Sequence, residues 1–211
     1  MISGKEGSYD HKTYGDISLS YLDYLVGGGD HYGQDYIRLV DKEFGKVGRI
    51  FEWCAGPGFI GFSLLASGLC DSLCLADVSE VAGDACHDTA RRNGLEDRVD
   101  VYVSDGLKDI PESESWDLVI GNPPHSGTDK ELHWGPELIY RDLGWKVHED
   151  LYTNVGKFLA PNSQVIIQEN KNLSSSADFA QMIETGGLGD VRTTDNDLHD
   201  DIYYIWSSPS S

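Results

Sequence analysis

Short apolar runs alternate with segments of helical periodicity along most of the chain, and this alternation is the feature that most restricts its fold. Each apolar run has the length of one buried strand, and each periodic segment is long enough for a crossover helix. Alternating strands and helices build a parallel sheet that is covered on both faces. Strands are predicted at 49–53, 72–77, 99–103, 116–120, 165–168, 190–194 and 202–207, and helices at 34–45, 59–67, 80–93, 144–159 and 177–185.

The last two predicted strands differ from the others, because only the polar stretch 195–201 connects them. A connection without a helix favours antiparallel pairing. The sequence therefore predicts an α/β fold, with a Rossmann-like, doubly wound, mainly parallel seven-stranded sheet and a C-terminal antiparallel hairpin at its edge. Residues 34–211 are expected to form this single domain. Residues 1–33, which carry the flexible run Gly27-Gly28-Gly29, are expected to form an N-terminal arm or lid.

Composition excludes several classes of protein. The 211 residues are 39% hydrophobic and 25% charged, as in an ordinary globular domain. No apolar run approaches the roughly 20 residues of a membrane span, and the first 20 residues lack the apolar core of a secretory signal, so we expect a cytoplasmic protein without membrane contact. The cysteines lack zinc-site spacing and are expected to be reduced and buried, with no metal bound. They are Cys54, Cys70, Cys74 and Cys86.

A glycine-rich turn follows the first predicted strand, in the stretch from Glu52 to Gly61. Its glycines, Gly56, Gly58 and Gly61, match G-x-G-x-x-G and let a ligand approach the backbone at a helix N-terminus. Asp77 ends the second strand, and its carboxylate can accept hydrogen bonds from both hydroxyls of a ribose. These features fit NAD or another adenosine cofactor, and a tight structural turn would also explain the glycines.

The third strand ends before Asp105, which could accept a hydrogen bond from the exocyclic amine of an adenine. Val78 and Leu107 are the apolar side chains expected on either side of such a ring. The alternative is a solvated aspartate that begins a turn at Gly106. Because Glu52 and Asp77 also stand at strand ends, we favour the adenine-binding interpretation.

The fourth strand runs into Gly121-Asn122-Pro123-Pro124-His125. Two prolines after an asparagine present several hydrogen-bond acceptors and few donors, an arrangement suited to a substrate NH₂ group. In open α/β sheets ligands bind outside the carboxyl ends of the strands, which is where Asn122 is expected.

From Gly56, Asp77 and the Asn-Pro-Pro stretch, the chain resembles the class I S-adenosylmethionine-dependent methyltransferases over about residues 30–207. It is most similar to their amino-group methylating branch, which includes HemK-type glutamine methyltransferases and small-domain RNA base methyltransferases. The resemblance implies S-adenosyl-L-methionine as the cofactor. It places the methionine end near Glu52, Cys54, Ala55, Gly56 and Gly58, with Gly33 and Gln34 at the methionine carboxylate or amine, the ribose at Asp77, and the adenine near Val78, Asp105, Gly106 and Leu107.

Two residues depart from the family pattern. Cys54 stands where many members have a glycine, which is compatible with the turn if this position has a negative φ. His125 stands where an aromatic Phe, Tyr or Trp is usual, so the resemblance does not specify the substrate.

The expected chemistry uses the acceptors of the corner formed by Asn122 to His125. An amide or aromatic amine is a poor nucleophile, because its nitrogen lone pair is delocalised. If the Asn122 side-chain oxygen and the Pro123 carbonyl each accept one N–H, the lone pair turns toward the methyl carbon. His125 could accept the released proton or stack on a planar substrate, and Trp134 could provide a further stacking surface or only pack.

The formal charge of −20 disfavours bare nucleic acid, whose phosphates attract Lys and Arg. A protein side chain or a small-molecule amine is therefore the favoured substrate, and a nucleobase is the alternative. Two other functions fit part of the sequence. An NAD-type oxidoreductase would use the glycine turn and Asp77 but would leave Asn122 to His125 without a role, and a non-catalytic scaffold would bind the cofactor without turnover.

Overall fold

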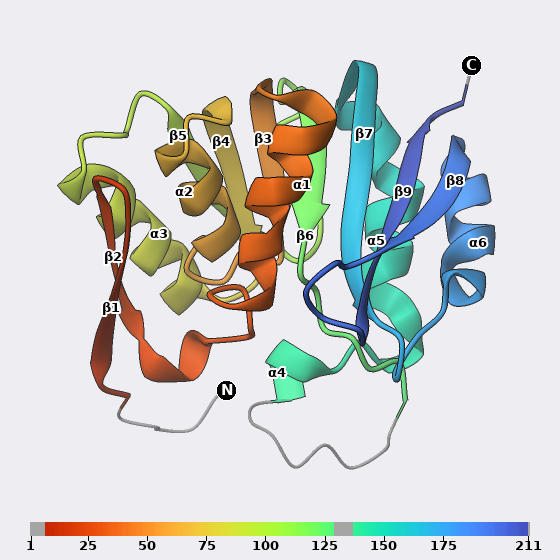
Figure 1. Cartoon of the computed structure of the whole chain (residues 1–211), viewed down its shortest axis with the longest axis horizontal. Coiled ribbons are helices and arrows are strands. Elements are labelled where there is room, and N and C mark those ends of the chain that lie inside the picture. Colours follow the sequence, from red (N-terminus) through yellow and green to blue (C-terminus); the bar gives the residue numbers. More distant parts are fainter. Residues whose placement is uncertain (1–6, 129–136, 211) are drawn as a thin grey trace.

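A seven-stranded sheet crosses the molecule (Figure 1) in the computed structural model, which describes residues 7–128 and 137–210. The strand order is β5-β4-β3-β6-β7-β9-β8, and β9 alone runs antiparallel to its neighbours. This confirms the predicted fold class. The strands are β3 (Val47–Trp53), β4 (Cys70–Asp77), β5 (Val99–Val103), β6 (Trp116–Gly121), β7 (Leu159–Asn170), β8 (Leu188–Asp195) and β9 (Ile202–Pro209).

The predicted C-terminal hairpin consists of β8 and β9, which pair antiparallel at one side of the sheet. The final strand β9 inserts between β7 and β8, so that β8 forms the edge. β9 is buried over nearly its whole length, whereas β8 is mostly exposed or half-buried, as expected for a central and an edge strand.

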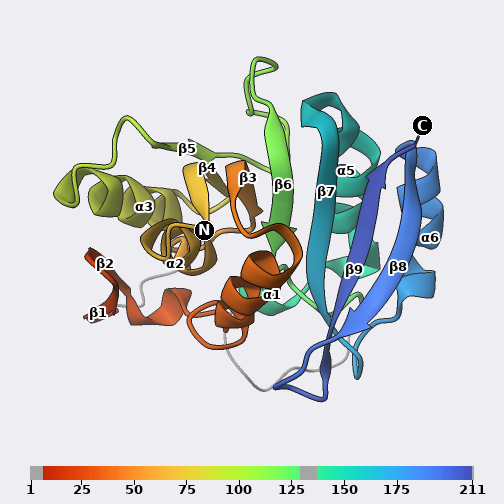
Figure 2. The same ribbon diagram turned by 45° about the horizontal axis from the view of Figure 1, so that its top comes forward.

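Helices cover both faces of the sheet, as Figure 2 shows. Adjacent residues of a strand point to opposite faces, so Ile50 packs in one core and Phe51 in the other. The first core lies beneath α1 (Asp35–Phe44), α2 (Phe59–Ala66) and α3 (Glu80–Arg92). The second lies beneath α5 (Lys146–Asn154) and α6 (Ser176–Thr185). A short helix, α4 (Glu137–Tyr140), precedes α5.

The order of the strands reverses at β3, which pairs with β4 on one side and with β6 on the other. The connection after β3 leads to β4 on one side of the sheet, and the connection after β6 leads to β7 on the other side. Because the two connections diverge, a crevice opens at the carboxyl ends of β3 and β6. The register places Trp53 opposite Gly121. The glycine turn after β3 and the corner after β6 consequently begin side by side.

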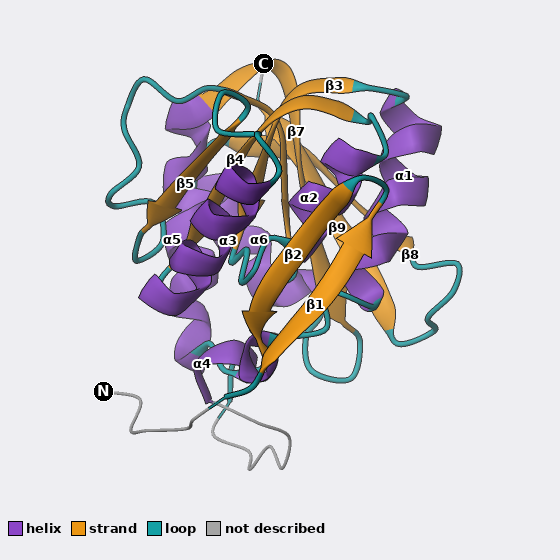
Figure 3. Ribbon diagram, turned by 90° about the vertical axis from the view of Figure 1, so that its left-hand side faces the viewer, coloured by secondary structure: helices purple, strands orange, loops and turns teal. Residues whose placement is uncertain are grey.

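The N-terminal segment contains a hairpin that the sequence analysis did not predict. Strands β1 (Tyr9–Tyr14) and β2 (Ile17–Leu22) pair antiparallel through a turn at Gly15, and they form a separate two-stranded sheet (Figure 3). Leu19 is buried in the first core. Ser18 and Asn93 exchange two hydrogen bonds of 3.0 Å, which attach the hairpin to the end of α3.

The helix predicted at 144–159 is wrong at both ends. Gly144 and Trp145 have φ values of 69° and 56°, in the left-handed region, so the regular helix begins only at Lys146. After Asn154 the chain tightens into a 3₁₀ turn, and β7 begins at Leu159 instead of the predicted residue 165. A bulge in the pairing of β7 with β6 spans Pro161, so its missing N–H costs no ladder hydrogen bond.

No helix in the two described segments is long and apolar enough to cross a membrane.

Candidate functional site

The turn after β3 has the compact backbone that a close approach to a ligand requires. Gly56 and Gly58 have φ values of 52° and 77°. Cys54 has a φ of 53°, so the negative φ under which a non-glycine residue would fit this position without strain is not observed. The chain has to leave the sheet edge sharply here, and the hydrogen bond from Ala55 N to Ala76 O (2.9 Å) holds it in that conformation. Cys54 is half-buried, whereas Cys70, Cys74 and Cys86 are buried as expected, and all four thiols are free.

Glu52 lies beneath this turn rather than on its outer surface. Its carboxyl oxygens accept hydrogen bonds from Gly61 N (2.7 Å) and Ile60 N (3.3 Å), and the residue is buried. Burial raises the pKa of Glu52 to about 8, and the backbone donors only partly oppose this. Gly61 is required for this packing, since a Cβ there would lie 2.7 Å from Glu52 Oε2.

Asp77 connects the end of β4 to the glycine turn. One of its oxygens accepts from Gly56 N (2.8 Å) and the other from Ser79 N (2.9 Å). Burial raises the pKa of Asp77, and these donors partly offset the effect. Each carboxylate oxygen has a second lone pair that can accept from a hydroxyl. Val78, the next residue, is exposed.

The loop after β5 holds the three remaining residues predicted at the adenine. Asp105 is 67% exposed and forms an ion pair with Lys108. Leu107 is buried, and its N–H donates to Asp150 Oδ2 at 3.0 Å. Gly106 lies against the same carboxylate, where a Cβ would not fit.

The segment 25–29 lies between the turn after β3 and the corner after β6. Leu25 O lies next to Gly56, and Gly29 packs on Phe59. The Gln34 side chain donates to Gly29 O (3.0 Å) and Phe59 O (3.3 Å), and Gly33 packs against Ile60. Asn122 Nδ2 donates to Gly27 O (2.9 Å), so this segment is bonded directly to the predicted catalytic asparagine.

In the corner after β6, Pro123 and Pro124 are buried and Asn122 and His125 are half-buried. Asn122 Oδ1 accepts from Gln168 Nε2 at 3.0 Å and lies 3.0 Å from His125 Nε2. These contacts orient the side-chain amide. Trp134, predicted as a stacking surface, lies outside the described residues.

Three aromatic rings gather beside this corner. His31, Tyr32 and His199 contact one another with centroid separations of 4.7 to 5.0 Å. A Cβ at Gly28 would lie 3.1 Å from the Tyr32 ring and 3.8 Å from Asn122 Nδ2, so this aromatic cluster adjoins the corner.

A chain of buried polar side chains continues from His125 into the second core, and sequence reasoning missed it. His125 Nδ1 lies 3.4 Å from Glu169 Oε2, and Glu169 Oε1 accepts from His148 Nε2 at 2.8 Å. His148 Nδ1 donates to Asp142 Oδ2 at 2.6 Å. Glu169 and His148 are fully buried. The one signal in the sequence is Glu169, a charged residue that closely follows the apolar run 165–167 of β7, whereas His148 lies in a mostly polar helix and gives no such signal.

Hydrogen bonds and charge explain how this cluster is tolerated. His148 faces a carboxylate with each nitrogen, and these partners outweigh burial and raise its pKa to about 9. His148, with a further contribution from His125, lowers the pKa of Glu169 to about 2 despite burial. His148 is therefore an imidazolium between two carboxylates. The rings of Trp53, Trp145 and Phe179 surround it with centroid separations of 4.7 to 5.2 Å.

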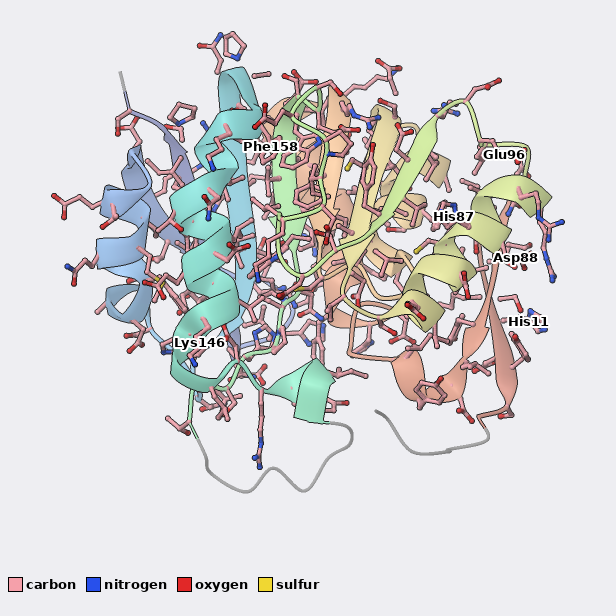
Figure 4. The ribbon with its side chains drawn as sticks, turned by 180° about the vertical axis from the view of Figure 1, so that it is seen from behind. His11, His87, Asp88, Glu96, Lys146 and Phe158 are labelled. Atoms are coloured by element: carbon pink, nitrogen blue, oxygen red, sulfur yellow. The ribbon has the colours of Figure 1, made fainter. Side chains whose placement is uncertain are left out.

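Local pairing brings Asp142 into the cluster. Ser126 bridges to the segment before α5 through hydrogen bonds from Ser126 N to Tyr140 O (3.1 Å) and from Asp142 N to Ser126 O (2.9 Å). Asp142 then accepts from the first free N–H groups of α5, at Val147 (2.9 Å) and His148 (3.0 Å). In Figure 4, α5 and the 3₁₀ turn after it run from Lys146 near this edge of the sheet to Phe158 at the opposite end.

A groove of about 1000 Å³ lies on another side of the molecule, between the N-terminal hairpin, α3 and β5. Its lining includes His11, His87, Asp88 and Glu96, which Figure 4 labels, but none of the predicted site residues. Arg91 and Arg92, the two adjacent basic residues of α3, both pair with Asp88. This one carboxylate offsets half of their combined positive charge.

The residues at the carboxyl edge fit an adenosine cofactor. Gly56 has open space where a side chain would project, with Leu25 O at 3.7 Å as its nearest neighbour. Asp77 retains acceptor capacity beside this turn. The helix that follows, α2, begins at Phe59, and its N–H groups at Ile60 and Gly61 are bonded to Glu52, which holds the turn at the helix N-terminus.

Known proteins with similar sequences include methyltransferases. Residues 36–184 match the family described as methyltransferase small domain. A bifunctional methyltransferase of Rickettsia felis is 23% identical over 57% of this chain and 24% of its own length. A release factor glutamine methyltransferase of Agrobacterium fabrum is 28% identical over 63% of this chain and 49% of its own length. The chain thus spans half or less of these relatives.

A similar fold occurs in a Streptococcus pneumoniae protein described as a tRNA (m1A22) methyltransferase, solved in complex with S-adenosyl-L-methionine. Its TM-score is 0.59 at 15% identity, over 83% of this chain and 72% of that one.

Proposed function

The chain belongs to the methyltransferase small domain family, and we propose that it transfers a methyl group to a planar amide or amino nitrogen. The domain is of the S-adenosylmethionine-dependent type, so S-adenosyl-L-methionine is its cofactor. The observation that carries the proposal is the position of Asn122 after β6, beside the turn that follows β3. Methyl donor and nitrogen acceptor would meet across that strand switch point.

The cofactor assignments extend over three strand ends. Gly56, Gly58, Cys54 and Ala55 would contact the methionine end, with Glu52 supporting the turn from below. Asp77 would accept from the ribose hydroxyls. The adenine would be surrounded by Val78, Asp105, Gly106 and Leu107. To bind the base, the Asp105 side chain would have to break its ion pair with Lys108. Gly33 and Gln34 would act through the segment 25–29 that they hold in place.

Asn122 would bind the nitrogen that receives the methyl group. Its Oδ1 accepts from Gln168 and lies 3.0 Å from His125 Nε2, so a substrate N–H would approach the second lone pair of Oδ1 beside the histidine. The Pro123 carbonyl would accept the second N–H. As the N–C bond forms, the C–S electron pair leaves with sulfur and positive charge moves to nitrogen, so fixed acceptors stabilise the transition state.

His125 would accept the proton that the methylated nitrogen releases. A proton on a nitrogen bound to Asn122 Oδ1 is within reach of His125 Nε2, because these two acceptor atoms lie 3.0 Å apart. The His125 side chain is 19% exposed, so it can pass the proton to water.

The proposed substrate is a protein side chain or a small-molecule amine. The charge of −20 supports this over a nucleobase in RNA or DNA. The relative described as a release factor glutamine methyltransferase supports an amide nitrogen. The aromatic cluster of His31, Tyr32 and His199 supports a planar substrate. We propose that the enzyme acts in the cytoplasm, consistent with its four free thiols.

The test is incubation with S-adenosyl-L-methionine labelled in the methyl group and a fractionated cell extract. Label is expected in the protein or small-molecule fraction and should resist release as methanol under mild base, as an N-methyl group does. Label in RNA or DNA would contradict the substrate class. Label on oxygen, released by base, would contradict nitrogen transfer.

A further inference from the structure

The buried side chains behind His125 have a net charge that the proposed reaction can use. Asp142 and Glu169 are carboxylates and His148 is an imidazolium, so these three residues sum to one negative charge. The charge lies on the side of His125 that faces away from Asn122. Both nitrogens of His148 are bonded to carboxylates, so neither has a lone pair for a metal ion.

We propose that Glu169 is a positioning residue that holds the proton of neutral His125 on Nδ1, leaving Nε2 free to accept the substrate proton. This inference rests on the proposed function. Asp142 and His148 have the role of keeping Glu169 ionised and in place. The arrangement follows the general logic in which a buried carboxylate fixes the tautomer of a catalytic histidine.

The contacts of His125 support this tautomer. Its two ring nitrogens face two acceptors, Glu169 Oε2 at 3.4 Å and Asn122 Oδ1 at 3.0 Å, and the neutral ring has one proton. A hydrogen bond to a carboxylate is roughly twice as strong as one to a neutral amide oxygen. The proton therefore goes to Nδ1 and Glu169, although this contact is the longer of the two. His125 Nε2 and Asn122 Oδ1 then face each other as two acceptors, and a substrate N–H group can donate between them.

The contacts of Glu169 are arranged to leave one oxygen for His125. Oε1 accepts from His148 Nε2 at 2.8 Å. Oε2 accepts from Ser174 Oγ at 2.9 Å and faces His125 Nδ1. Ser174 is in turn 3.2 Å from the Tyr203 hydroxyl, so strand β9 also fixes this carboxylate. The Glu169 side chain is fully buried, which removes alternative contacts with water.

The proton balance of the reaction is satisfied by His125 alone. Methyl transfer forms an N–C bond, breaks the C–S bond and releases one proton from the nitrogen. Uptake of that proton at Nε2 gives an imidazolium that donates to Asn122 Oδ1 and to Glu169. The four residues Asp142, His148, Glu169 and His125 are then neutral in sum, so the buried negative charge stabilises the product of the proton transfer.

The test is the ring ¹⁵N spectrum of His125 in the full chain without substrate, at a pH where the ring is neutral, assigned by its loss in His125→Asn. The wild-type protein should show a protonated Nδ1 and an unprotonated Nε2. Glu169→Gln should reverse this, because the amide NH₂ of glutamine donates to Nδ1 and forces the proton to Nε2. The same variant should reduce methyl transfer by about 10²-fold to 10⁴-fold.

Glu114→Gln is the matched control. Glu114 is another largely buried carboxylate, paired with Arg49 at 2.7 Å at the start of β6, away from the site. The Glu114→Gln variant should change neither the His125 spectrum nor methyl transfer.

A wild-type His125 with its proton on Nε2, or a Glu169→Gln spectrum like that of the wild type, would overturn the inference. The wild-type spectrum decides the question if Glu169→Gln does not fold. Because the spectrum needs no substrate, it separates this inference from the proposed function, which the labelling test decides.

Discussion

The buried carboxyl of Glu52 should make the protein less stable as the pH rises from 4.5 toward 8. In the unfolded chain this group ionises near pH 4.5, whereas in the folded chain its pKa is about 8. A group with a raised folded pKa contributes stability that is complete below the unfolded pKa and is lost as the pH rises through the folded pKa. The full loss corresponds to on the order of 5 kcal/mol, and about 3 kcal/mol is lost by pH 7.

Glu52→Gln isolates this effect, because glutamine cannot ionise and still offers an oxygen to Gly61 N. Urea denaturation at several pH values between 5 and 8 gives the free energy of unfolding of the variant relative to wild type. The variant should gain up to about 1.4 kcal/mol per pH unit relative to wild type. His148, whose stabilisation is lost between pH 6.5 and 9, and Asp77 also make the free energy of unfolding depend on pH. They contribute equally to variant and wild type, so their contributions cancel in the difference.

Glu114→Gln provides the control for this experiment as well. Arg49 lowers the pKa of Glu114 despite its burial, so the stability from this carboxylate is complete above pH 4.5 and is lost only at lower pH. Its effect on stability should therefore be constant between pH 5 and 8. An effect of Glu52→Gln that is also constant over this range would contradict a raised pKa of Glu52 in the folded chain.

Two further predictions concern the carboxyl edge of the sheet. Asp77→Ala should weaken binding of S-adenosylhomocysteine by about 1.5 to 3 kcal/mol, or roughly 10-fold to 150-fold, and a calorimetric affinity within twofold of wild type would exclude the ribose contact. Cys54→Val should lower the free energy of unfolding by about 2 kcal/mol, since a β-branched residue fits poorly at a φ of 53°, while Cys54→Gly should stay within about 1 kcal/mol of wild type. Equal stability of these two variants in urea would contradict the left-handed backbone.

The regular part of the fold could be predicted because buried parallel strands are continuous apolar runs. The segments 72–77 and 116–120 lie inside β4 and β6, and the edge hairpin followed from the polar connection at 195–201. The ends of α5 could not be predicted. Trp145 has no propensity for the left-handed region, and its conformation follows from tertiary contacts such as its close packing on Gly127.

The N-terminal hairpin was missed although β2 alternates Ile17, Leu19 and Tyr21 with polar residues, because the two strands are short and β1 is largely polar. In β1 every residue is exposed or half-buried, so the segment has no apolar periodicity, and its position depends on contacts such as the one between Ser18 and Asn93. The assignment of residues 1–33 as an arm or lid remains a prediction. The bond from Asn122 to Gly27 O supports it.

The candidate site could be predicted where its residues follow strands directly and not where they meet only in space. Gly56, Asp77 and Asn122 each follow a predicted strand, so a parallel sheet brings them to one edge. Asp142, His148 and Glu169 are distant from His125 in sequence. Their association depends on the pairing of Ser126 with the segment before α5, which no local pattern encodes.

Asn122 has the proposed role of binding the nitrogen that receives the methyl group, and a comparison of Asn122→Ala with wild type tests this role. The measurement is transfer of labelled methyl from S-adenosyl-L-methionine to the fraction that the wild-type protein labels. We predict a rate reduced by about 10²-fold to 10³-fold, with the affinity for S-adenosylhomocysteine within twofold of wild type. A variant that transfers methyl at the wild-type rate would contradict the account.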